Sequence, residues 1–385
     1  MSAVATQTVP LSSYENPTRR IIGDGSLARL PELLETFKPR TVLWVLGKSA
    51  FRDSEHHRRL RAPLSGLKHL ESEPVETNPR ISFLEEMRRE FAAARPDLIL
   101  GIGGGSVIDC AKALRMLLAQ PDPAPMQDYL EGRAHFAKRG LPFIAVPTTA
   151  GTGSEVTHYA SLRTSDNKKV SLTHPWLFPE VALIDPELTY SMPPYLTACS
   201  GLDALSQAIE SYWSLHASPF SQTHSLRAVS LIVRHFERLF ESPADPEARF
   251  GLSLASSEAG LAISQSRTTA VHAVSYPLTT FFGIPHGHAC ALTLPFFIRY
   301  NASVLGPALS RPLWQVMNVS SWEQAAETVE RLIARSGIER SLRKLGLAQA
   351  DLPKVAENGC RSDRAGNNPR EVTQETVREV LEQIY

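Results

Sequence analysis

The first half of the chain alternates short apolar runs with helical patterns. The apolar runs at 41–46, 97–102 and 141–146 have the length and composition of buried strands. Residues 80–94 instead carry apolar side chains at helical spacing, directly after an Asn-Pro turn signal. This alternation predicts a parallel sheet with helices on its faces, and sheets of that kind bind ligands at the carboxyl ends of their strands.

The pattern changes after about residue 187, where obvious strands disappear. Long amphipathic stretches predict helices over 196–215, 219–240, 246–264, 321–336 and 374–384. The segment Ser-Met-Pro-Pro at 191–194 marks the change, and Pro194 suits the first position of the next helix. We therefore expect an N-terminal α/β domain with a parallel sheet over 1–190 and an all-helical domain over 191–385.

Composition agrees with two ordinary globular domains. A chain of 385 residues is too long for one ordinary core. Lys plus Arg equals Asp plus Glu at 40 each, so no global field attracts nucleic acid or an anionic membrane. The N-terminus lacks the pattern of a signal peptide, and no apolar run approaches the ~20 residues that span a bilayer. We expect a cytoplasmic protein whose four scattered cysteines are reduced core thiols.

Two glycine-rich segments follow predicted strands. They read Gly-Gly-Gly-Ser at 103–106 and Thr-Thr-Ala-Gly-Thr-Gly-Ser-Glu at 148–155. Backbone N–H groups at a helix start favour a pyrophosphate, although neither segment matches GxGxxG or a P-loop. One such segment is a tight turn about as readily as a phosphate site, but two at adjacent strand ends favour a dinucleotide.

The end of the first strand bears on which dinucleotide binds. An acidic residue there would bind the ribose of NAD and repel a 2′-phosphate, but this chain has Gly47, Lys48 and Ser49, with Arg52 close behind. These residues favour NADPH over NADH. The alternative is that the two cations merely belong to a solvated loop.

Two separate segments supply candidate metal ligands. Asp203 and Gln207 are four residues apart, so a helix would point both side chains the same way. His272 and His286 come from a later segment and would complete a four-ligand site. Because Asp203 lies among apolar residues and buried carboxylates are costly unless paired or bound to metal, we expect a divalent metal, Fe(II) or Zn(II). The alternative is a solvated helix face and ordinary histidines.

Several longer motifs resemble the iron-containing (group III) alcohol dehydrogenase family, whose fold is also that of dehydroquinate synthase. They lie at 103–112, 147–157, 192–194, 201–205 and 285–287, and the match runs in order from about residue 15 to the C-terminus. The resemblance implies a dinucleotide-binding α/β domain, an all-α metal and substrate domain, and hydride transfer between them. It implies metal ligands at Asp203, Gln207, His272 and His286. It also implies cofactor contacts at Asn78, Gly104, Gly105, Ser106, Asp109, Thr148, Thr149 and Lys169.

Two residues depart from the family pattern. Gln207 stands where the family usually has a histidine, and an amide oxygen is a weaker donor than imidazole. Tyr276 stands where the family usually has a second histidine, a candidate proton-relay group. We expect Tyr276 or His288 to relay a proton through solvent, although a phenol matches neutral pH less well than an imidazole.

A third departure concerns the substrate. Arg267, Thr268 and Thr269 replace the small neutral residues that commonly precede His272 in the family. A guanidinium with two hydroxyls suits an anionic, oxygen-rich group such as a phosphonate or carboxylate. The variant set resembles the phosphonoacetaldehyde reductase branch, which serves phosphonate and antibiotic biosynthesis. The alternative is that Arg267 pairs with a carboxylate such as Glu258 and never meets substrate.

The function expected from this reading is NAD(P)H-linked, metal-dependent reduction of a small aldehyde to a primary alcohol. The first choice is phosphonoacetaldehyde to 2-hydroxyethylphosphonate, with Tyr276, Arg267 and His288 as candidate catalytic residues, in a homodimer. One alternative is a general alcohol or polyol dehydrogenase of the same family. The others are a dehydroquinate synthase-like lyase and a cofactor-binding protein without metal.

Overall fold

Six parallel strands form one sheet in the first half of the chain, in the order β1-β8-β5-β4-β2-β3. The structure is a computed structural model and describes residues 13–385 except 49–50, 53, 62–63, 65 and 362. The sheet strands are β1 (Arg19–Ile22), β2 (Thr41–Leu46), β3 (Lys68–Glu71), β4 (Leu98–Gly103), β5 (Phe143–Pro147) and β8 (Val181–Ile184). Winding proceeds from β2 to β3 in one direction and from β4 to β5 in the other. The carboxyl ends of β2 and β4 therefore flank the switch point, where sheets of this type bind ligands.

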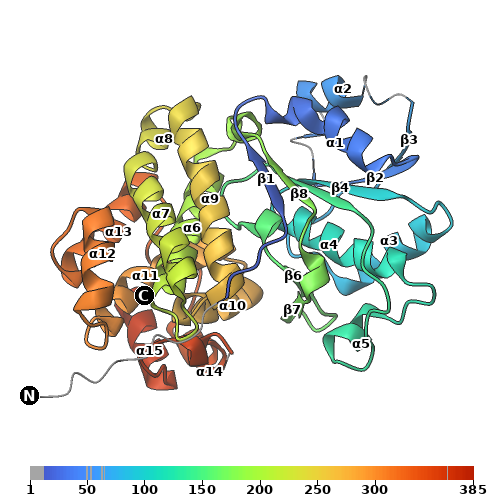
Figure 1. The fold of residues 1–385 in the computed structure, drawn as a ribbon. Coiled ribbons are helices and arrows are strands. Elements are labelled where there is room, and N and C mark those ends of the chain that lie inside the picture. The colour runs from blue at the N-terminus through green and yellow to red at the C-terminus, as the bar shows by residue number, and fades with distance from the viewer. Residues whose placement is uncertain (1–12, 49–50, 53, 62–63, 65, 362) are drawn as a thin grey trace, which may run out of the picture.

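Helices cover both faces of this sheet (Figure 1). They are α1 (Leu30–Phe37) and α2 (Glu55–Arg61) on one face, and α3 (Ile81–Ala92) and α4 (Gly105–Ala119) on the other. Alternate residues of β2 pack into the apolar cores on the two faces of the sheet, because side chains alternate across a strand. Leu43 and Val45 pack with α3 and α4, whereas Val42 and Trp44 pack with α1 and α2. The short helix α5 (Met126–Leu130) and the hairpin of β6 (Tyr159–Arg163) and β7 (Lys169–Thr173) complete this half.

The second half is built around α6 (Pro194–Trp213), which is buried along most of its length. Its neighbours are α7 (Pro219–His235), α9 (Pro246–Ser266) and α11 (His286–Asn301). The other helices are α8 (Arg238–Glu241), α10 (Ala270–Phe282), α12 (Pro307–Met317), α13 (Trp322–Ser336), α14 (Leu352–Cys360) and α15 (Gln374–Gln383). Because α6 is buried along most of its length, its neighbours hold it in place, and it is a fixed platform for the polar side chains that it carries.

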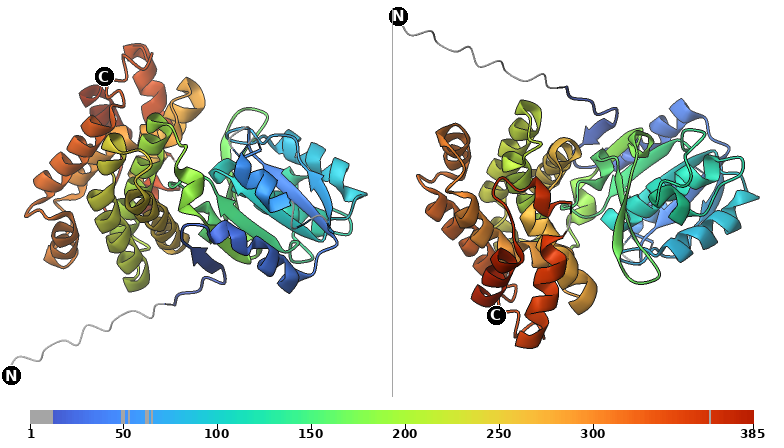
Figure 2. Two further views of the ribbon diagram at one scale, coloured as in Figure 1. Left: turned by 90° about the horizontal axis from the view of Figure 1, so that it is seen from above. Right: turned by 90° about the horizontal axis from the view of Figure 1, so that it is seen from below.

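The two halves lie side by side, as both views in Figure 2 show. They touch closely where the short helix η3 (Ser154–Val156) meets α9. Gly153 has a positive φ of 60°, and a Cβ on Gly260 would lie 2.6 Å from the Gly153 carbonyl oxygen. Arg20 adds an ion pair across the halves, with its Nη1 3.1 Å from Glu258 Oε1. These contacts seat the second glycine-rich segment against the helical half.

The fold class expected from the sequence is confirmed: a parallel-sheet α/β half precedes an all-helical half. The three expected strands are β2, β4 and β5, and Pro194 is the first residue of α6. The helix expected over 219–240 is instead two helices, α7 and α8. The pattern missed α10, α11 and α12, each of which contains an internal proline (Pro277, Pro295 and Pro312). The boundary at 190/191 stays a prediction.

Two further expectations concern the cysteines and the membrane. All four cysteines are unpaired, and Cys110, Cys199 and Cys290 are buried. Within the described residues, none of the helices has both the length and the apolar character that crossing a membrane requires.

Candidate active site between the two halves

A cavity of about 940 Å³ lies between the sheet half and the helical half. Its walls on one side are the carboxyl ends of β2, β4 and β5 with both glycine-rich segments. On the other side are residues of α6, α10 and the start of α11. The cavity therefore joins the expected dinucleotide site to the expected metal site.

Most of the expected cofactor residues line this cavity. They are Gly47, Lys48, Asn78, Gly104, Gly105, Ser106, Asp109, Thr148, Thr149 and Lys169. Ser49 lies outside the described residues. Gly104 precedes α4 and Gly105 begins it, so free N–H groups of the helix start face the cavity. A Cβ on Gly105 would lie 2.7 Å from Thr152, which shows how closely the two segments approach.

Asp109 connects the start of α4 to the loops beside it, and together with the two glycine-rich segments it forms what we call the dinucleotide cradle. Its Oδ1 accepts a hydrogen bond from Ser154 Oγ, and its Oδ2 accepts one from the Ser161 backbone N at 2.9 Å. Ser106 Oγ similarly accepts from the Asn78 backbone N at 3.1 Å. These contacts tie the start of α4 to the neighbouring loops and hold the glycine-rich segments in place.

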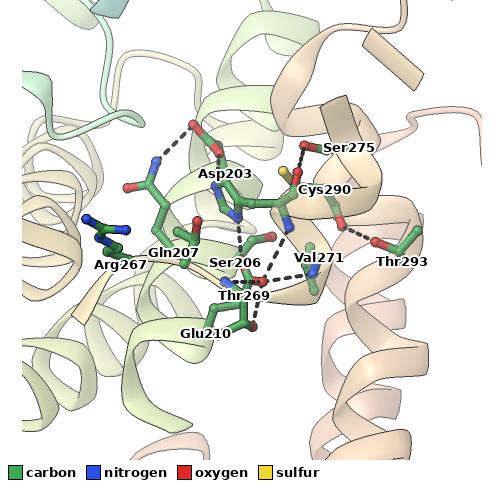
Figure 3. Close-up of polar contacts among 12 residues, drawn as sticks. Asp203, Ser206, Gln207, Glu210, Arg267, Thr269, Val271, Ser275, Cys290 and Thr293 are labelled. Atoms are coloured by element: carbon green, nitrogen blue, oxygen red, sulfur yellow. Dashed lines mark hydrogen bonds and ion pairs between the residues drawn. The ribbon is translucent and has the colours of Figure 1, made fainter. Parts of the chain in front are cut away.

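The four expected metal ligands come together at the helical wall of the cavity. Figure 3 shows Asp203 and Gln207 side by side on α6. Asp203 and Gln207 lie on successive turns of α6, while His272 lies in the first turn of α10 and His286 begins α11. Asp203 Oδ1 is 3.4 Å from His272 Nε2 and 3.9 Å from His286 Nε2. Gln207 Nε2 donates to Asp203 Oδ2 at 3.2 Å.

Hydrogen bonds behind the two histidines set their orientation. Glu210 Oε2 bonds His272 Nδ1, and Glu210 Oε1 accepts from the backbone N of Thr269 and Val271 at 2.9 and 2.8 Å. Ser275 Oγ donates to the His272 carbonyl oxygen at 2.8 Å, so it accepts from His286 Nδ1 at 3.2 Å. With both Nδ1 atoms occupied in this way, both Nε2 atoms face Asp203.

The residues fit a divalent cation. Asp203 Oδ1 and Gln207 Oε1 are buried and have no hydrogen-bond partner. Each unsatisfied buried polar group costs about 1–3 kcal/mol, so a cation among them would stabilise the folded protein. The imidazole and carboxylate donors match the ligand preferences of Zn(II) and Fe(II).

Gly287 allows this convergence. A Cβ at this position would lie 1.9 Å from the Cys199 carbonyl oxygen and 2.9 Å from Asp203 Cβ. The start of α11 therefore rests directly on the α6 backbone, and only glycine leaves room for it. This close approach brings His286 to Asp203.

Tyr276 lies beside the four candidate ligands Asp203, Gln207, His272 and His286, here called the metal group, and close to two cations. Its ring stacks on the His286 ring at 5.7 Å, while Lys169 Nζ and Arg364 Cζ are 4.6 and 4.8 Å from its centroid. All four residues line the cavity. Burial, followed by the charges of Lys169, His272 and Arg364, lowers the pKa of His286 well below its usual value. His286 is therefore neutral and keeps its Nε2 lone pair.

Arg267 lies elsewhere than the sequence suggested. It ends α9 at a positive φ of 60°, and its Nη1 is 3.4 Å from Asp363 Oδ2. Its side chain is 54% exposed and is not among the residues that line the cavity. The alternative, that Arg267 pairs with a carboxylate, agrees with this contact, although the partner is Asp363 and not Glu258, which pairs with Arg20, His224 and Arg227. Arg364 occupies the cavity wall instead.

His288 does not line the cavity either. It is 1% exposed, and its Nε2 donates to the Glu339 carbonyl oxygen at 2.6 Å. Its Nδ1 therefore accepts from the Tyr195 hydroxyl, 3.0 Å away. His288 contacts the cavity only indirectly, through Tyr195, which lines it. The expectation that His288 itself relays a proton to substrate is therefore wrong.

The sequence analysis missed Glu210 and Arg364. Glu210 had a weak signal, because it is an acidic residue on the same apolar helix as Asp203 and Gln207. Arg364 had only its position a few residues before the motif Asn-Pro-Arg at 368–370. Arg364 lies 97 residues after Arg267, so no local signal indicated that it lines the cavity and Arg267 does not.

Comparison with known families covers both halves of the chain. The family described as iron-containing alcohol dehydrogenase matches residues 17–186, and the one described as Fe-containing alcohol dehydrogenase family, C-terminal, matches residues 197–385. The chain belongs to the iron-containing alcohol dehydrogenase family. The dinucleotide cradle and the metal group of this iron-containing alcohol dehydrogenase thus lie on its two matched halves.

Individual relatives agree with this membership. Long-chain-alcohol dehydrogenase 1 of Geobacillus thermodenitrificans is 35% identical over 315 residues, 78% of this chain and 79% of the relative. Lactaldehyde reductase of Escherichia coli is 33% identical, over 80% of this chain and 81% of the relative. The solved structure of sulfoacetaldehyde reductase from Bifidobacterium kashiwanohense, in complex with NAD+, has 31% identity and a TM-score of 0.91, covering 98% of this chain and 99% of that one. The chain is an NAD(P)-dependent alcohol dehydrogenase or aldehyde reductase with a divalent metal, which disfavours the lyase and metal-free alternatives.

Proposed function

We propose that this enzyme reduces a two-carbon aldehyde with an anionic tail, in the first instance phosphonoacetaldehyde to 2-hydroxyethylphosphonate. The observation that carries the proposal is the pair of cations, Lys169 and Arg364, beside the metal group. Among the described residues no carboxylate lies within ion-pair distance of Lys169, and Arg364 has only the largely exposed Asp363 at 3.3 Å. A substrate anion would balance this positive charge.

The positions of these groups suit a short substrate. Tyr276 contacts both cations and also the metal-ligand residue His286. An aldehyde carbonyl at the metal group and an anion at Arg364 would thus both lie next to the same tyrosine ring. The solved relative named sulfoacetaldehyde reductase supports this size class, because sulfoacetaldehyde carries a sulfonate where phosphonoacetaldehyde carries a phosphonate.

The chain's own groups divide the remaining work. When bound, the divalent metal supplies a Lewis acid and the dinucleotide supplies the hydride. Asp203, His272 and His286 would hold the metal, and the helix start at Gly105 would hold the pyrophosphate. Tyr276 is the group we propose to donate the proton through its hydroxyl, because it lines the cavity and His288 does not.

NADPH is the proposed cofactor in preference to NADH. Gly47, which has no carboxylate, follows directly after β2, and Lys48 lies next to it, 3.2 Å from Glu76. Both members of this pair are exposed, so Lys48 can turn to a 2′-phosphate at little cost. We expect kcat/KM for NADPH to exceed that for NADH, and a preference for NADH would contradict the assignment.

The test compares anionic and neutral aldehydes of similar length. Purified enzyme is assayed for NADPH oxidation with phosphonoacetaldehyde, sulfoacetaldehyde and propanal. Arg364→Met removes the charge but keeps a long side chain, and Arg267→Met is the matched control outside the cavity. Because a hydrogen bond to a charged group contributes about 1.5–3 kcal/mol, Arg364→Met should raise KM for the anionic aldehydes by roughly 10–100-fold. KM for propanal, and all values for Arg267→Met, should change little.

Two results would contradict the proposal. Equal losses for neutral and anionic aldehydes in Arg364→Met would mean that Arg364 supports the site rather than binding the tail. A wild-type enzyme that prefers propanal or a diol would favour the second candidate, a general alcohol or polyol dehydrogenase. The relatives named 1,3-propanediol dehydrogenase and lactaldehyde reductase support that second candidate. A homodimer in the cytoplasm remains part of the proposal, and light scattering in solution tests its oligomeric part.

A further inference from the structure

A fifth donor reaches the metal group. The Cys290 sulfur lies in one cluster with ligand atoms of Asp203, His272 and His286, all within 4.8 Å of one another. Cys290 is fully buried on α11. In Figure 3 its sulfur lies on the opposite side of Asp203 from Gln207. The site therefore offers one donor more than the four that the family pattern predicts.

Helix geometry explains why this sulfur is present. Cys290 follows His286 by four residues on α11, just as Gln207 follows Asp203 by four on α6. Residues at this spacing share a helix face, so both helices direct a pair of side chains toward the same point. Gly287 lets the two helices meet there.

Gln207 is hydrogen-bonded to Asp203. Its Nε2 donates to Asp203 Oδ2 at 3.2 Å, whereas its own Oε1 and Asp203 Oδ1 are both buried without a hydrogen-bond partner. Of these two oxygens, Asp203 Oδ1 is the one 3.4 and 3.9 Å from the histidine Nε2 atoms. If Gln207 turned its oxygen to that place instead, two acceptors would face each other. Gln207 is therefore suited to orient Asp203 rather than to bind the cation itself.

Cys290 also approaches from the appropriate side. Asp203, Gln207, His272 and His286 line the cavity, whereas Cys290 does not. Its sulfur thus faces the cluster from the protein interior and leaves the cavity side open for a substrate. An open position on the substrate side is what a catalytic metal site requires.

We propose that Cys290, as a thiolate, is the fourth protein ligand of the divalent metal, in the role that Gln207 would otherwise have. A cation deprotonates a coordinating thiol, and a thiolate favours Zn(II) over harder cations. The donor set then contains one carboxylate oxygen, two imidazole nitrogens and one sulfur. This assignment concerns the metal alone and does not depend on which aldehyde the enzyme reduces.

Cobalt substitution tests the assignment without an activity assay. The metal-free protein is loaded with one equivalent of Co(II) and its absorption spectrum is recorded, with bound metal measured by elemental analysis. Wild type and Gln207→Ala should show a thiolate-to-cobalt charge-transfer band in the near ultraviolet. Cys290→Ser should lose the band, and Cys199→Ser, which changes the other buried cysteine near Asp203, should retain it. Zinc affinity of Cys290→Ser should fall by more than about 100-fold, because even outer partners of a metal site typically contribute 10–100-fold.

X-ray absorption at the zinc edge of the wild-type holoprotein covers the case in which Cys290→Ser does not fold. One sulfur at about 2.3 Å from zinc is expected. A first shell of nitrogen and oxygen alone would overturn the proposal. So would a cobalt band that persists in Cys290→Ser, or a wild-type protein with one bound Co(II) and no such band.

Discussion

The Glu210 carboxylate holds the His272 ring by its Nδ1 atom, deep inside the helical half. The same carboxylate accepts hydrogen bonds from backbone N–H groups of Thr269 and Val271. One side chain of α6 therefore fixes both the start of α10 and the orientation of the histidine on it. The metal group depends on this buried contact as much as on the ligands themselves.

Replacing Glu210 by Gln should weaken metal binding. In glutamine one carboxylate oxygen becomes an N–H₂ group, which cannot accept the hydrogen bonds that His272 Nδ1 and the backbone N–H groups now donate. His272 would therefore lose its fixed orientation. We expect zinc affinity to fall by roughly 10–100-fold, measured by competition with a chromophoric chelator. Glu258→Gln is the matched control, because it breaks a buried ion pair on α9 away from the metal group. Unchanged affinity in Glu210→Gln would contradict this role.

A methyl group at Gly287 should separate α11 from α6. The added Cβ would lie 1.9 Å from the Cys199 carbonyl oxygen, a distance that backbone movement must relieve. His286 would move with it, so Gly287→Ala should lower metal content and the melting temperature together. Gly306→Ala serves as control, since a Cβ there meets nothing within 4 Å. Normal metal content in Gly287→Ala would show that α11 tolerates the shift.

The Tyr276 hydroxyl should matter for turnover more than for binding. Positioned proton donors typically contribute about 10²–10⁴-fold to rate, so Tyr276→Phe should reduce kcat by at least roughly 10-fold. The phenyl ring would still lie against both cations, so KM for the aldehyde should change little. Steady-state kinetics with Tyr276→His alongside provides the comparison, because imidazole restores a proton donor. If Tyr276→Phe keeps full kcat, solvent alone supplies the proton.

Acid should destabilise the protein partly through His158. Burial, with the charges of Lys112, Arg267 and His174, lowers the pKa of His158 from 6.5 to about 4. Between these values the unfolded chain binds a proton that the folded chain does not, so the free energy of unfolding falls as pH falls through this window. Urea denaturation at pH 7 and pH 4.5 should show a smaller loss in His158→Gln than in wild type. Equal losses would assign the acid sensitivity to other groups.

Much of the site was predictable from local signals. Asp203 and Gln207 declare themselves by spacing on one helix, and Gly104 and Gly105 by their place after a strand. Periodicity and the conformational freedom of glycine made these residues candidates, and the resemblance to a known family selected them as ligands and cofactor contacts. The helices α10 and α11 were missed because their internal prolines interrupt that periodicity.

Other parts of the site depend on how distant segments pack. Arg267 precedes His272 by five residues, yet the end of α9 directs it to Asp363. Arg364, almost a hundred residues later, reaches Tyr276 in its place. At Arg267 the chain leaves α9 with a positive φ, so the Arg267 side chain points away from the cavity that His272 lines.

The amino-acid order alone established the two kinds of domain, the dinucleotide cradle and the candidate ligands, because these follow from local periodicity and from motifs. It left open which donors surround the metal and which cation meets the substrate. The folded chain bears on those questions by bringing Cys290 to Asp203 and Arg364 to Tyr276. Such contacts arise from the burial of α6 among its neighbours, a property of the packed core that no single segment carries.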